Sequence, residues 1–285
     1  MSLFTIEDDI KLKLLEEFES LIKIRGEPNS ELDQYFLTIE SSLNRILLFN
    51  PLDYQGKRVI FLGDMDLSSF FLGKLSKPKD MAIIDIDPRV PDLTYSLKME
   101  HKIRSVRYIN HDLRTKTLAV VKDQYDFVFV ESPMTLEALE VWLSRAVQCV
   151  NHHTRGYIIL TCDIEENKKS KVTDIVEKMG LEIVKVVYEG AKYAFPTPLN
   201  KYSSDVYIIK SNENSRETIV HHYFGPTYYR EIKNPPYPYR CKCGTIIKIG
   251  EDGDYKTVEE LEEKGCPQNC GYTGKFIYNS SVEIE

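Results

Sequence analysis

Residues 57–66 read KRVIFLGDMD, and this stretch determines how the rest of the chain is interpreted. A short apolar run ends at Gly63, and two carboxylates, Asp64 and Asp66, follow it directly. Such a strand end is typical of nucleoside-binding parallel sheets, because ligands bind outside the carboxyl ends of the strands. We therefore predict a cofactor site at the end of this strand, with Gly63 and Asp64 among its binding residues.

A second strand end predicts the same site. Residues 85–89 read DIDPR and follow the apolar run 81–84, so Asp85 and Asp87 come where that run stops. A carboxylate at the end of the second strand of such a sheet usually accepts hydrogen bonds from ribose hydroxyl groups. Asp85 and Asp87 are therefore predicted to bind the cofactor.

Two more acidic residues follow later strands. Asp112, in NHDLR, comes where such folds contact the adenine amino group, and Glu131, in DFVFVESP, comes where they face the reacting part of the cofactor. Carboxylates gathered at one edge of a sheet favour a cation, such as a donor with a free amine or a polycationic acceptor. A structural alternative is that Asp64 or Asp66 only caps the helix expected from about residue 67.

The pattern from residue 56 onward alternates short β-branched or aromatic runs with amphipathic stretches. This alternation predicts a mainly parallel sheet with helices on both faces, the Rossmann-like α/β arrangement of class I S-adenosylmethionine-dependent transferases. Seven strands are expected, at residues 58–62, 81–86, 105–109, 125–130, 156–161, 181–188 and 205–210. Helices are expected at residues 67–75, 135–150 and 167–179.

The chain divides into four expected parts. Residues 1–55 form an N-terminal helical region, with one helix over 5–24 and a second from residues 29–30 to about 48. Residues 56–210 form the Rossmann-like transferase domain. Residues 211–239 are rich in Pro and Tyr and form a surface linker, and residues 240–285 form a small zinc-ribbon-like domain.

Composition narrows the functional classes. With 285 residues, 42% of them apolar, the chain can bury a full core, and its formal charge of −7 disfavours a nonspecific nucleic-acid binder. No apolar run approaches the ~18–20 residues that a membrane span needs. The acidic N-terminus does not resemble a signal peptide. We therefore expect a soluble cytoplasmic protein that binds no membrane.

An ordered series of motifs resembles the branched-chain polyamine synthases, the aminopropyltransferases that make bis(aminopropyl)spermidine. The resemblance covers about residues 30–165 and is weaker to about residue 210. It begins with Asp33-Gln34, Thr38, Glu40 and Arg45, and continues through GKRVIFLGDMDLSS, DIDPR, NHDLR and DFVFVESPMTLEALEVWLSRAV.

The resemblance implies an enzyme that passes the aminopropyl group of decarboxylated S-adenosylmethionine to the internal secondary amine of a polyamine such as spermidine. It implies catalytic roles for Glu131, Asp64 and Asp66. Before an amine can attack the carbon next to the sulfonium, it must lose its proton, and a nearby carboxylate can take that proton. Glu131 is the residue that we expect to do so.

Both acidic motifs of the family are altered in this chain. The family's Gly-Asp-Asp-Asp loop falls on residues 63–66, where Met65 replaces an acid. Its Asp-Pro-Pro-Glu motif falls on residues 131–134, which read Glu-Ser-Pro-Met. Glu131 keeps the carboxylate on an arm that is one methylene longer, and two other acids are lost. The acceptor is therefore left open.

Four cysteines near the C-terminus predict a zinc site. Cys241 and Cys243 form one close pair, Cys266 and Cys270 form another, and a glycine follows each pair. Two such pairs can surround a tetrahedral zinc ion, although one and three intervening residues differ from the usual spacing of two. Two disulfides are the alternative, which a reducing compartment disfavours. The expected role is structural stabilisation or docking.

Other functions stay open at this point. A methyltransferase that uses intact S-adenosylmethionine, on RNA for example, is one alternative, and a non-catalytic paralogue that binds a nucleoside or a polyamine is another. Nucleic-acid binding is open but not favoured, and assembly into a homo-oligomer is open. Tyr193, Phe195 and Tyr202 could clamp an alkylamine or serve in packing, and His221-His222 could approach the substrate from the linker.

Overall fold

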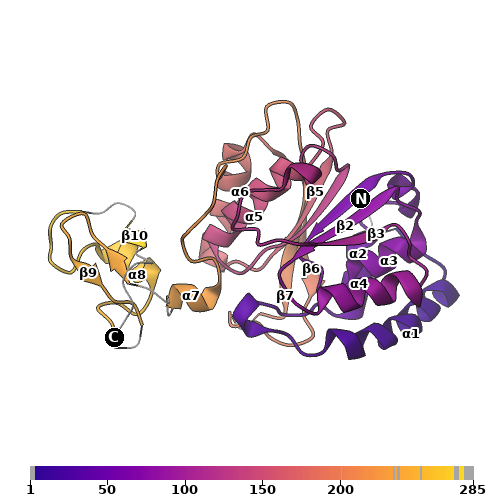
Figure 1. The fold of residues 1–285 in the computed structure, drawn as a ribbon, viewed down its shortest axis with the longest axis horizontal. Coiled ribbons are helices and arrows are strands. Elements are labelled where there is room, and N and C mark those ends of the chain that lie inside the picture. Colours follow the sequence, from indigo (N-terminus) through magenta and orange to yellow (C-terminus); the bar gives the residue numbers. More distant parts are fainter. Residues whose placement is uncertain are drawn as a thin grey trace.

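The computed structural model describes residues 4–199, 201–233, 235, 238–250, 252–272 and 276–278. Figure 1 shows a large α/β domain and a smaller C-terminal unit at its side, with the short helix α7 (Tyr229–Lys233) between them. Among the described residues, no helix is both long and apolar enough to cross a membrane.

The large domain contains a seven-stranded sheet. Its strands are β1 (Arg58–Leu62), β2 (Asp80–Asp85), β3 (Val106–Asn110), β4 (Phe127–Glu131), β5 (Tyr157–Cys162), β6 (Glu182–Lys192) and β7 (Ser203–Lys210). The order is β3-β2-β1-β4-β5-β7-β6, and only β7 runs antiparallel to its neighbours. The five strands β1 to β5, which pair in parallel, therefore end at one edge, which is where the predicted site residues follow them.

Helices cover both faces of this sheet (Figure 1). One face carries α1 (Asp8–Arg25), α2 (Ile39–Ile46), α3 (Ser68–Leu75) and α4 (Val90–Met99), and the other carries α5 (Leu136–Cys149) and α6 (Lys169–Lys178). Short 3₁₀ helices lie at Ser30–Leu32, Pro51–Tyr54, Ala119–Val121 and Glu166–Lys168. This is the predicted fold class.

The alternation of side chains along each strand explains the two cores. Val59 and Phe61 of β1 point into the core beneath α1 to α4, where Phe61 stacks on Phe129 of β4 with ring centroids 4.9 Å apart. Ile60 and Leu62 point into the core beneath α5 and α6. Strands that are buried on both faces need continuous apolar runs, and the sequence supplies them.

The helix predicted from residues 29–30 to about 48 is wrong in its first half. A 3₁₀ turn at Ser30–Leu32 ends at Asp33, whose φ of 51° is left-handed, and residues 34–37 follow without helical structure. Helix α2 begins only after Thr38, whose side chain caps it by accepting a hydrogen bond from the Ser41 amide. The backbone amide of Leu37 bonds instead to Asp66, so a tertiary contact overrides the local helical pattern.

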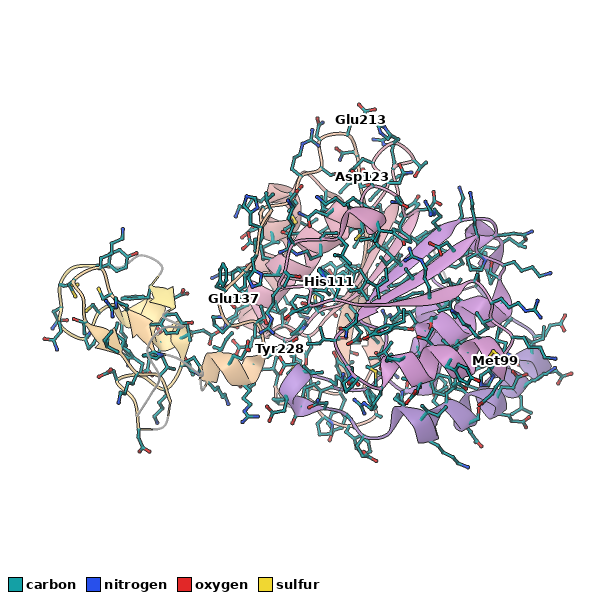
Figure 2. The ribbon with its side chains drawn as sticks, in the orientation of Figure 1. Met99, His111, Asp123, Glu137, Glu213 and Tyr228 are labelled. Atoms are coloured by element: carbon teal, nitrogen blue, oxygen red, sulfur yellow. The ribbon has the colours of Figure 1, made fainter. Side chains whose placement is uncertain are left out.

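Helix α4 was not predicted. Its proline at residue 91 suits the first turn of a helix, but two large apolar side chains, Tyr95 and Met99, are exposed and obscure the amphipathic pattern. Figure 2 shows Met99 on the outside of the large domain. Other expected elements match observed ones to within a few residues, apart from β6, which extends to Lys192.

Residues 211–228 run along the outer surface of α5. The buried guanidinium of Arg145 holds this segment by donating hydrogen bonds of 2.7 Å to the carbonyl oxygens of Ile219 and His221. Further along, the Thr135 hydroxyl donates to the carbonyl oxygen of Thr227 at 2.6 Å. The predicted linker is thus fixed to the domain up to the start of α7, while the division of the chain into four parts remains a prediction.

The C-terminal unit has its own small core. It contains a three-stranded sheet of β8 (Tyr239–Arg240), β9 (Ile246–Ile247) and β10 (Ile277–Tyr278), in the order β10-β8-β9, together with α8 (Val258–Lys264). The core combines Ile247 and Leu261 with two of the cysteines, and it also includes Ile232 of α7. Helix α7 therefore packs into the core of this unit through Ile232, and it also contacts the large domain.

Candidate active site

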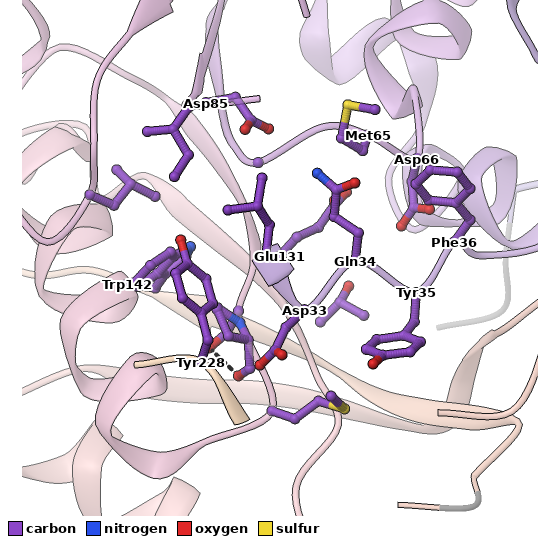
Figure 3. A pocket seen from close by; sticks show the side chains of 18 of the residues that line it. Asp33, Gln34, Tyr35, Phe36, Met65, Asp66, Asp85, Glu131, Trp142 and Tyr228 are labelled. Atoms are coloured by element: carbon purple, nitrogen blue, oxygen red, sulfur yellow. Dashed lines mark hydrogen bonds between the residues drawn. The ribbon is translucent and has the colours of Figure 1, made fainter. Parts of the chain in front are cut away.

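A cleft lies at the carboxyl edge of the parallel strands (Figure 3). It holds about 880 Å³ of space free of protein atoms when the open space at its mouth is included. Residues at or just after the ends of β1 to β6 line it, together with the segment 32–37, one residue of α5 and one residue just before α7. Five carboxylates are among the lining residues: Asp33, Asp66, Asp85, Asp112 and Glu131.

Glu131 ends β4 and is held by a buried arginine. The Nη1 atom of Arg45, on α2, lies 2.5 Å from Oε1 of Glu131 and 3.6 Å from Oδ2 of Asp66. Burial raises the pKa of Glu131 well above its ordinary value, the negative charge of Asp66 adds to this effect, and Arg45 opposes it. Two acids and one buried cation therefore form a compact charged group beneath the cleft.

Residues 63–66 divide between the cleft and the interior. Gly63 has a φ of 83°, and a Cβ atom there would lie 3.3 Å from the Cβ of Glu131, so a glycine lets the ends of β1 and β4 approach. The side chain of Asp64 accepts a hydrogen bond from the Ser69 amide at 3.3 Å, and Asp66 accepts one from Leu37 at 2.7 Å. Asp64 thus accepts a hydrogen bond from a backbone amide in the first turn of α3, as the capping alternative describes. It does not line the cleft.

Asp85 and Asp87 have different environments. Asp85 lines the cleft, and its buried position raises its pKa to about 6. Asp87 lies beneath it and is fully buried, where it accepts hydrogen bonds of 2.7 Å from both Arg89 and Gln34. Burial alone would raise the pKa of Asp87, but these bonds hold it below its ordinary value. Only Asp85 of the two faces the cleft.

Asp112 lines the cleft after β3 and is bound by Arg114. The guanidinium donates to both carboxylate oxygens, from Nε at 3.1 Å and from Nη2 at 2.7 Å. Burial would raise the pKa of Asp112, and the bonds from Arg114 lower it below its ordinary value. Arg114 also reaches Glu231 of α7 at 3.2 Å, which ties the C-terminal segment to this side of the cleft.

Several lining residues had no predicted role in the site. In the sequence, Asp33 belongs to the family pattern, Trp142 lies within the helix predicted over residues 135–150, and Tyr228 lies in the predicted linker. Figure 3 shows these three on one side of the cleft, with Glu131 nearer its centre. The family pattern at Asp33-Gln34 could have indicated that Asp33 belongs to the site. Trp142 fits the apolar periodicity of α5, and Tyr228 lies in a stretch with the composition of a linker, so neither position indicates a site residue.

The aromatic loop after β6 contributes one residue. Tyr193 lines the cleft, while the side chains of Phe195 and Tyr202 are 68% and 65% exposed and do not line it. Lys201 ties this loop down through an ion pair of 3.2 Å with the buried Asp163. Of the three aromatic residues of the predicted clamp, Tyr193 therefore lies in the wall of the cleft. His221 and His222 do not line the cleft.

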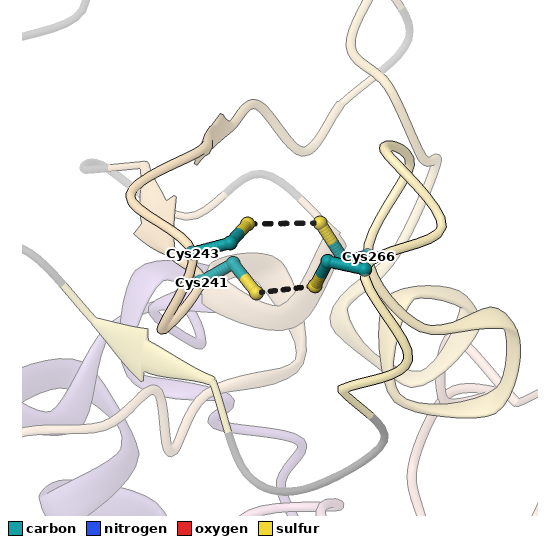
Figure 4. A group of neighbouring side chains, drawn as sticks. Cys241, Cys243 and Cys266 are labelled. Atoms are coloured by element: carbon teal, nitrogen blue, oxygen red, sulfur yellow. Dashed lines mark hydrogen bonds between the residues drawn. The ribbon is translucent and has the colours of Figure 1, made fainter.

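The four predicted metal ligands come together in the C-terminal unit (Figure 4). Their sulfur atoms lie within 4.8 Å of one another, with Cys241 3.4 Å from Cys270 and Cys243 3.7 Å from Cys266. These separations exceed the ~2.05 Å of a disulfide bond. They are close to the ~3.8 Å expected between sulfurs that surround one tetrahedral zinc ion at about 2.3 Å. The cluster thus fits zinc.

Comparison with solved structures defines the class. The branched-chain polyamine synthase of Thermus thermophilus, in complex with N4-aminopropylspermidine and 5′-methylthioadenosine, superposes with a TM-score of 0.67 over 77% of this chain and 69% of its own, at 18% identity. A Pyrococcus horikoshii protein, provisionally described as an RNA methyltransferase, gives 0.54 over 70% of this chain and 99% of its own, at 16% identity. The fold is that of the S-adenosylmethionine-dependent transferases.

The particular family follows from the sequence. Residues 13–211 match the branched-chain polyamine synthase A C-terminal domain, and the chain belongs to this family. The match ends before α7 and the cysteine cluster.

Two relatives in Methanocaldococcus jannaschii show how far the similarity extends. An uncharacterized protein is 26% identical over 89% of this chain and 63% of its own length. The N(4)-bis(aminopropyl)spermidine synthase is 31% identical over 52% of this chain and 43% of its own length. The chain thus spans less than two thirds of the length of these relatives.

Proposed function

We propose that this protein is an aminopropyltransferase that moves the aminopropyl group of decarboxylated S-adenosylmethionine to a polyamine. The observation that carries this proposal is a cleft with five carboxylates at the carboxyl edge of a family sheet, where a nucleoside donor would lie. The family membership and the two relatives' names support the same reaction. A donor with a free ammonium group and a polycationic acceptor both suit so acidic a cleft.

The proposed donor site uses the ends of the first three strands. Asp85 faces the cleft where ribose hydroxyl groups would donate to it, and Asp112, fixed by Arg114, would accept from the adenine amino group. Gly63 leaves room for the ligand next to Glu131 because it carries no side chain. Asp64 and Asp87 would act indirectly, since their hydrogen bonds hold the backbone that presents these residues.

Glu131 is the proposed general base. It would take a proton from the acceptor's amine, so that the nitrogen lone pair can form a bond to the carbon next to the sulfonium. The carbon–sulfur bond breaks, methylthioadenosine leaves with that electron pair, and the proton stays on Glu131 until the product departs. Arg45 and Asp66 would orient the carboxylate, and accurate positioning supplies much of the acceleration in such displacements.

The raised pKa of Glu131 suits this role. A base must be able to retain the proton that it receives, and burial next to Asp66 makes a protonated Glu131 easier to form. The positive charge of Arg45 and its hydrogen bond to the carboxylate oppose this rise in pKa. At positions 65 and 134, where the family motifs have acids, this chain has Met65 and Met134, and both line the cleft. These apolar side chains favour an acceptor that carries fewer positive charges near them.

The four cysteines are the proposed ligands of a structural zinc ion. Cys241 and Cys266 are buried in the core of the C-terminal unit, and their sulfurs face those of Cys270 and Cys243. A zinc ion bound by four thiolates stabilises a unit that is otherwise too small to bury a large core.

One comparison tests the donor. Calorimetry with decarboxylated and with intact S-adenosylmethionine should show at least tenfold tighter binding of the decarboxylated donor, because the carboxylate of the intact molecule would face the acidic cleft. Incubation with decarboxylated donor and a panel of linear polyamines should release methylthioadenosine together with a longer amine. Preference for the intact molecule would indicate a methyltransferase, and binding without turnover would indicate a non-catalytic paralogue. Either result would overturn the proposal.

A further inference from the structure

The five carboxylates of the cleft differ in whether a cation of the protein already neutralises them. Glu131 and Asp66 share Arg45, and Asp112 is bound by Arg114. Asp85 and Asp33 have no ion-pair partner among the residues that the structure describes. Asp85 occupies the proposed ribose position, so the carboxylate of Asp33 remains for a cationic ligand.

The carboxylate of Asp33 is held in place by backbone groups alone. Its Oδ2 atom accepts a hydrogen bond of 2.7 Å from the amide of Tyr229, and the amide of Met134 donates a second bond. The residue also has a left-handed backbone with a φ of 51°, a conformation that aspartate tolerates better than most residues. Burial raises its pKa to about 6, which still leaves it ionised at neutral pH.

Aromatic rings surround this carboxylate. Trp142 and Tyr228, each only 6% exposed, line the cleft with ring centroids 6.4 Å apart in an edge-to-face arrangement, and Tyr35 lines it as well. Figure 3 shows Tyr228 and Trp142 next to Asp33. A carboxylate with aromatic walls is a favourable environment for an alkylammonium ion, which gains from both a charge-assisted hydrogen bond and cation–π attraction.

Part of this arrangement comes from outside the family domain. The match ends at residue 211, but Tyr228 supplies a ring, and Tyr229 supplies the amide that holds Asp33. The carboxylate of Glu231 accepts hydrogen bonds from the amides of Thr227 and Tyr228, at 2.8 and 3.1 Å, and so fixes the turn that presents both tyrosines. This end of the cleft is therefore completed by a segment that the family domain does not include.

We propose that Asp33, with Tyr228 and Trp142, forms the subsite for a terminal ammonium group of the acceptor polyamine, while the reacting nitrogen lies at Glu131. This inference rests on the proposed function. In it, Asp33 and Tyr228 determine acceptor specificity and take no part in proton transfer.

The test compares spermidine with two analogues that each lack one terminal amine, N-butyl-1,3-diaminopropane and N-propylputrescine. Asp33→Asn keeps the shape and an acceptor oxygen for the Tyr229 amide. It should raise the KM for spermidine about 10- to 100-fold, the loss expected for one hydrogen bond to a charged group. The donor KM and kcat should change by less than about twofold. For one of the two analogues, Asp33→Asn should change KM little, because that analogue has no ammonium group for the subsite.

Two variants complete the design. Tyr228→Leu should raise the KM for the same acceptors as Asp33→Asn, and Asp174→Asn, on the exposed face of α6, should leave all constants unchanged. An equal rise in KM for spermidine and for both analogues would overturn the subsite, as would a fall in kcat at unchanged KM.

Calorimetry of spermidine binding separates this inference from the proposed function. If the wild-type protein shows no turnover, the proposed function fails. Weaker spermidine binding by Asp33→Asn, with unchanged binding of one analogue, would then still support the subsite. Equal spermidine binding by both proteins would overturn it.

Discussion

In the large domain, two apolar cores lie on opposite faces of seven strands, and each contains fully buried side chains such as Phe61 or Val147. The C-terminal unit has one small core, whose members lie in the sequence from Ile232 to Phe276. Two of these members are Cys241 and Cys266. The large domain can therefore fold through burial of apolar surface, whereas we expect the small unit to need a metal ion on its four cysteines. The proposed active site and the proposed zinc site therefore lie in separate parts of the chain.

The largest expected effect is the loss of the C-terminal unit without zinc. Chelation of the metal, or Cys243→Ser, should unfold the unit, because ligand binding and folding are coupled in such sites at about 10–16 kcal/mol of apparent free energy. Limited proteolysis should then cut within residues 240–272 and leave a large fragment that melts cooperatively. Cys149→Ala, at a buried cysteine of α5 outside the cluster, is the control. Unchanged protection after chelation would show that the unit folds without metal.

The second prediction concerns the chemistry of the sheet edge. Glu131→Gln should lower the rate of aminopropyl transfer about 100- to 10,000-fold, because the amide cannot take the proton of the acceptor amine. Release of methylthioadenosine in single-turnover experiments measures this step. Glu177→Gln, on the exposed face of α6, should react at the wild-type rate. Full activity of Glu131→Gln would remove Glu131 from the mechanism.

The third prediction tests the buried charge beneath the cleft. Arg45→Met should lower the free energy of unfolding by about 3–5 kcal/mol at pH 7, because it leaves Glu131 and Asp66 buried without their cation. The matched control is Arg230→Met, which breaks an exposed ion pair with Glu31 and should cost at most ~1 kcal/mol. Urea denaturation of both variants measures the difference. Equal stabilities would show that the acids are satisfied without Arg45.

A smaller effect is expected from pH. Burial raises the pKa of Asp64 to about 7, so the folded protein binds this proton more tightly than the unfolded chain does. The resulting stabilisation is complete below about pH 4, the ordinary pKa of an aspartate, and is lost as the pH rises through about 7. In Asp64→Asn this side chain cannot take up or release a proton. The stability of the wild type relative to this variant should therefore fall between pH 4 and 8, by on the order of 1 kcal/mol or more in denaturant titrations. A constant difference would contradict the pKa shift.

The sequence predicted the sheet well because most of the parallel strands are apolar runs with a polar residue at or soon after their end. Asp85, Asp112 and Glu131 were placed at strand ends for this reason, and the structure has all three in the cleft. The parts that sequence reasoning missed depend on contacts between distant residues. Nothing local shows that Arg45 bonds to Glu131, 86 positions later, or that Tyr228 returns to the cleft.

Local signals also misled in one region. Residues 29–48 have helical spacing, yet residues 34–37 are not helical, and the amide of Leu37 bonds to Asp66 instead. The capping alternative for Asp64 agrees with its hydrogen bond from Ser69, whereas Asp66 serves a distant segment. Two similar acids in one loop thus have different partners, and only the tertiary structure distinguishes them.

The Glu231 carboxylate contacts two parts of the cleft wall, and this has a kinetic consequence. One oxygen of its carboxylate holds the turn that presents Tyr228, and the other accepts from Arg114, which binds Asp112. The proposed donor and acceptor ends of the cleft thus share Glu231, so occupation of either end should change the affinity of the other, and by the same factor. We expect initial-rate plots at varied donor and acceptor concentrations to intersect, as in a ternary-complex mechanism. In Glu231→Gln the two substrates should bind independently, with apparent constants that no longer change with the concentration of the other substrate.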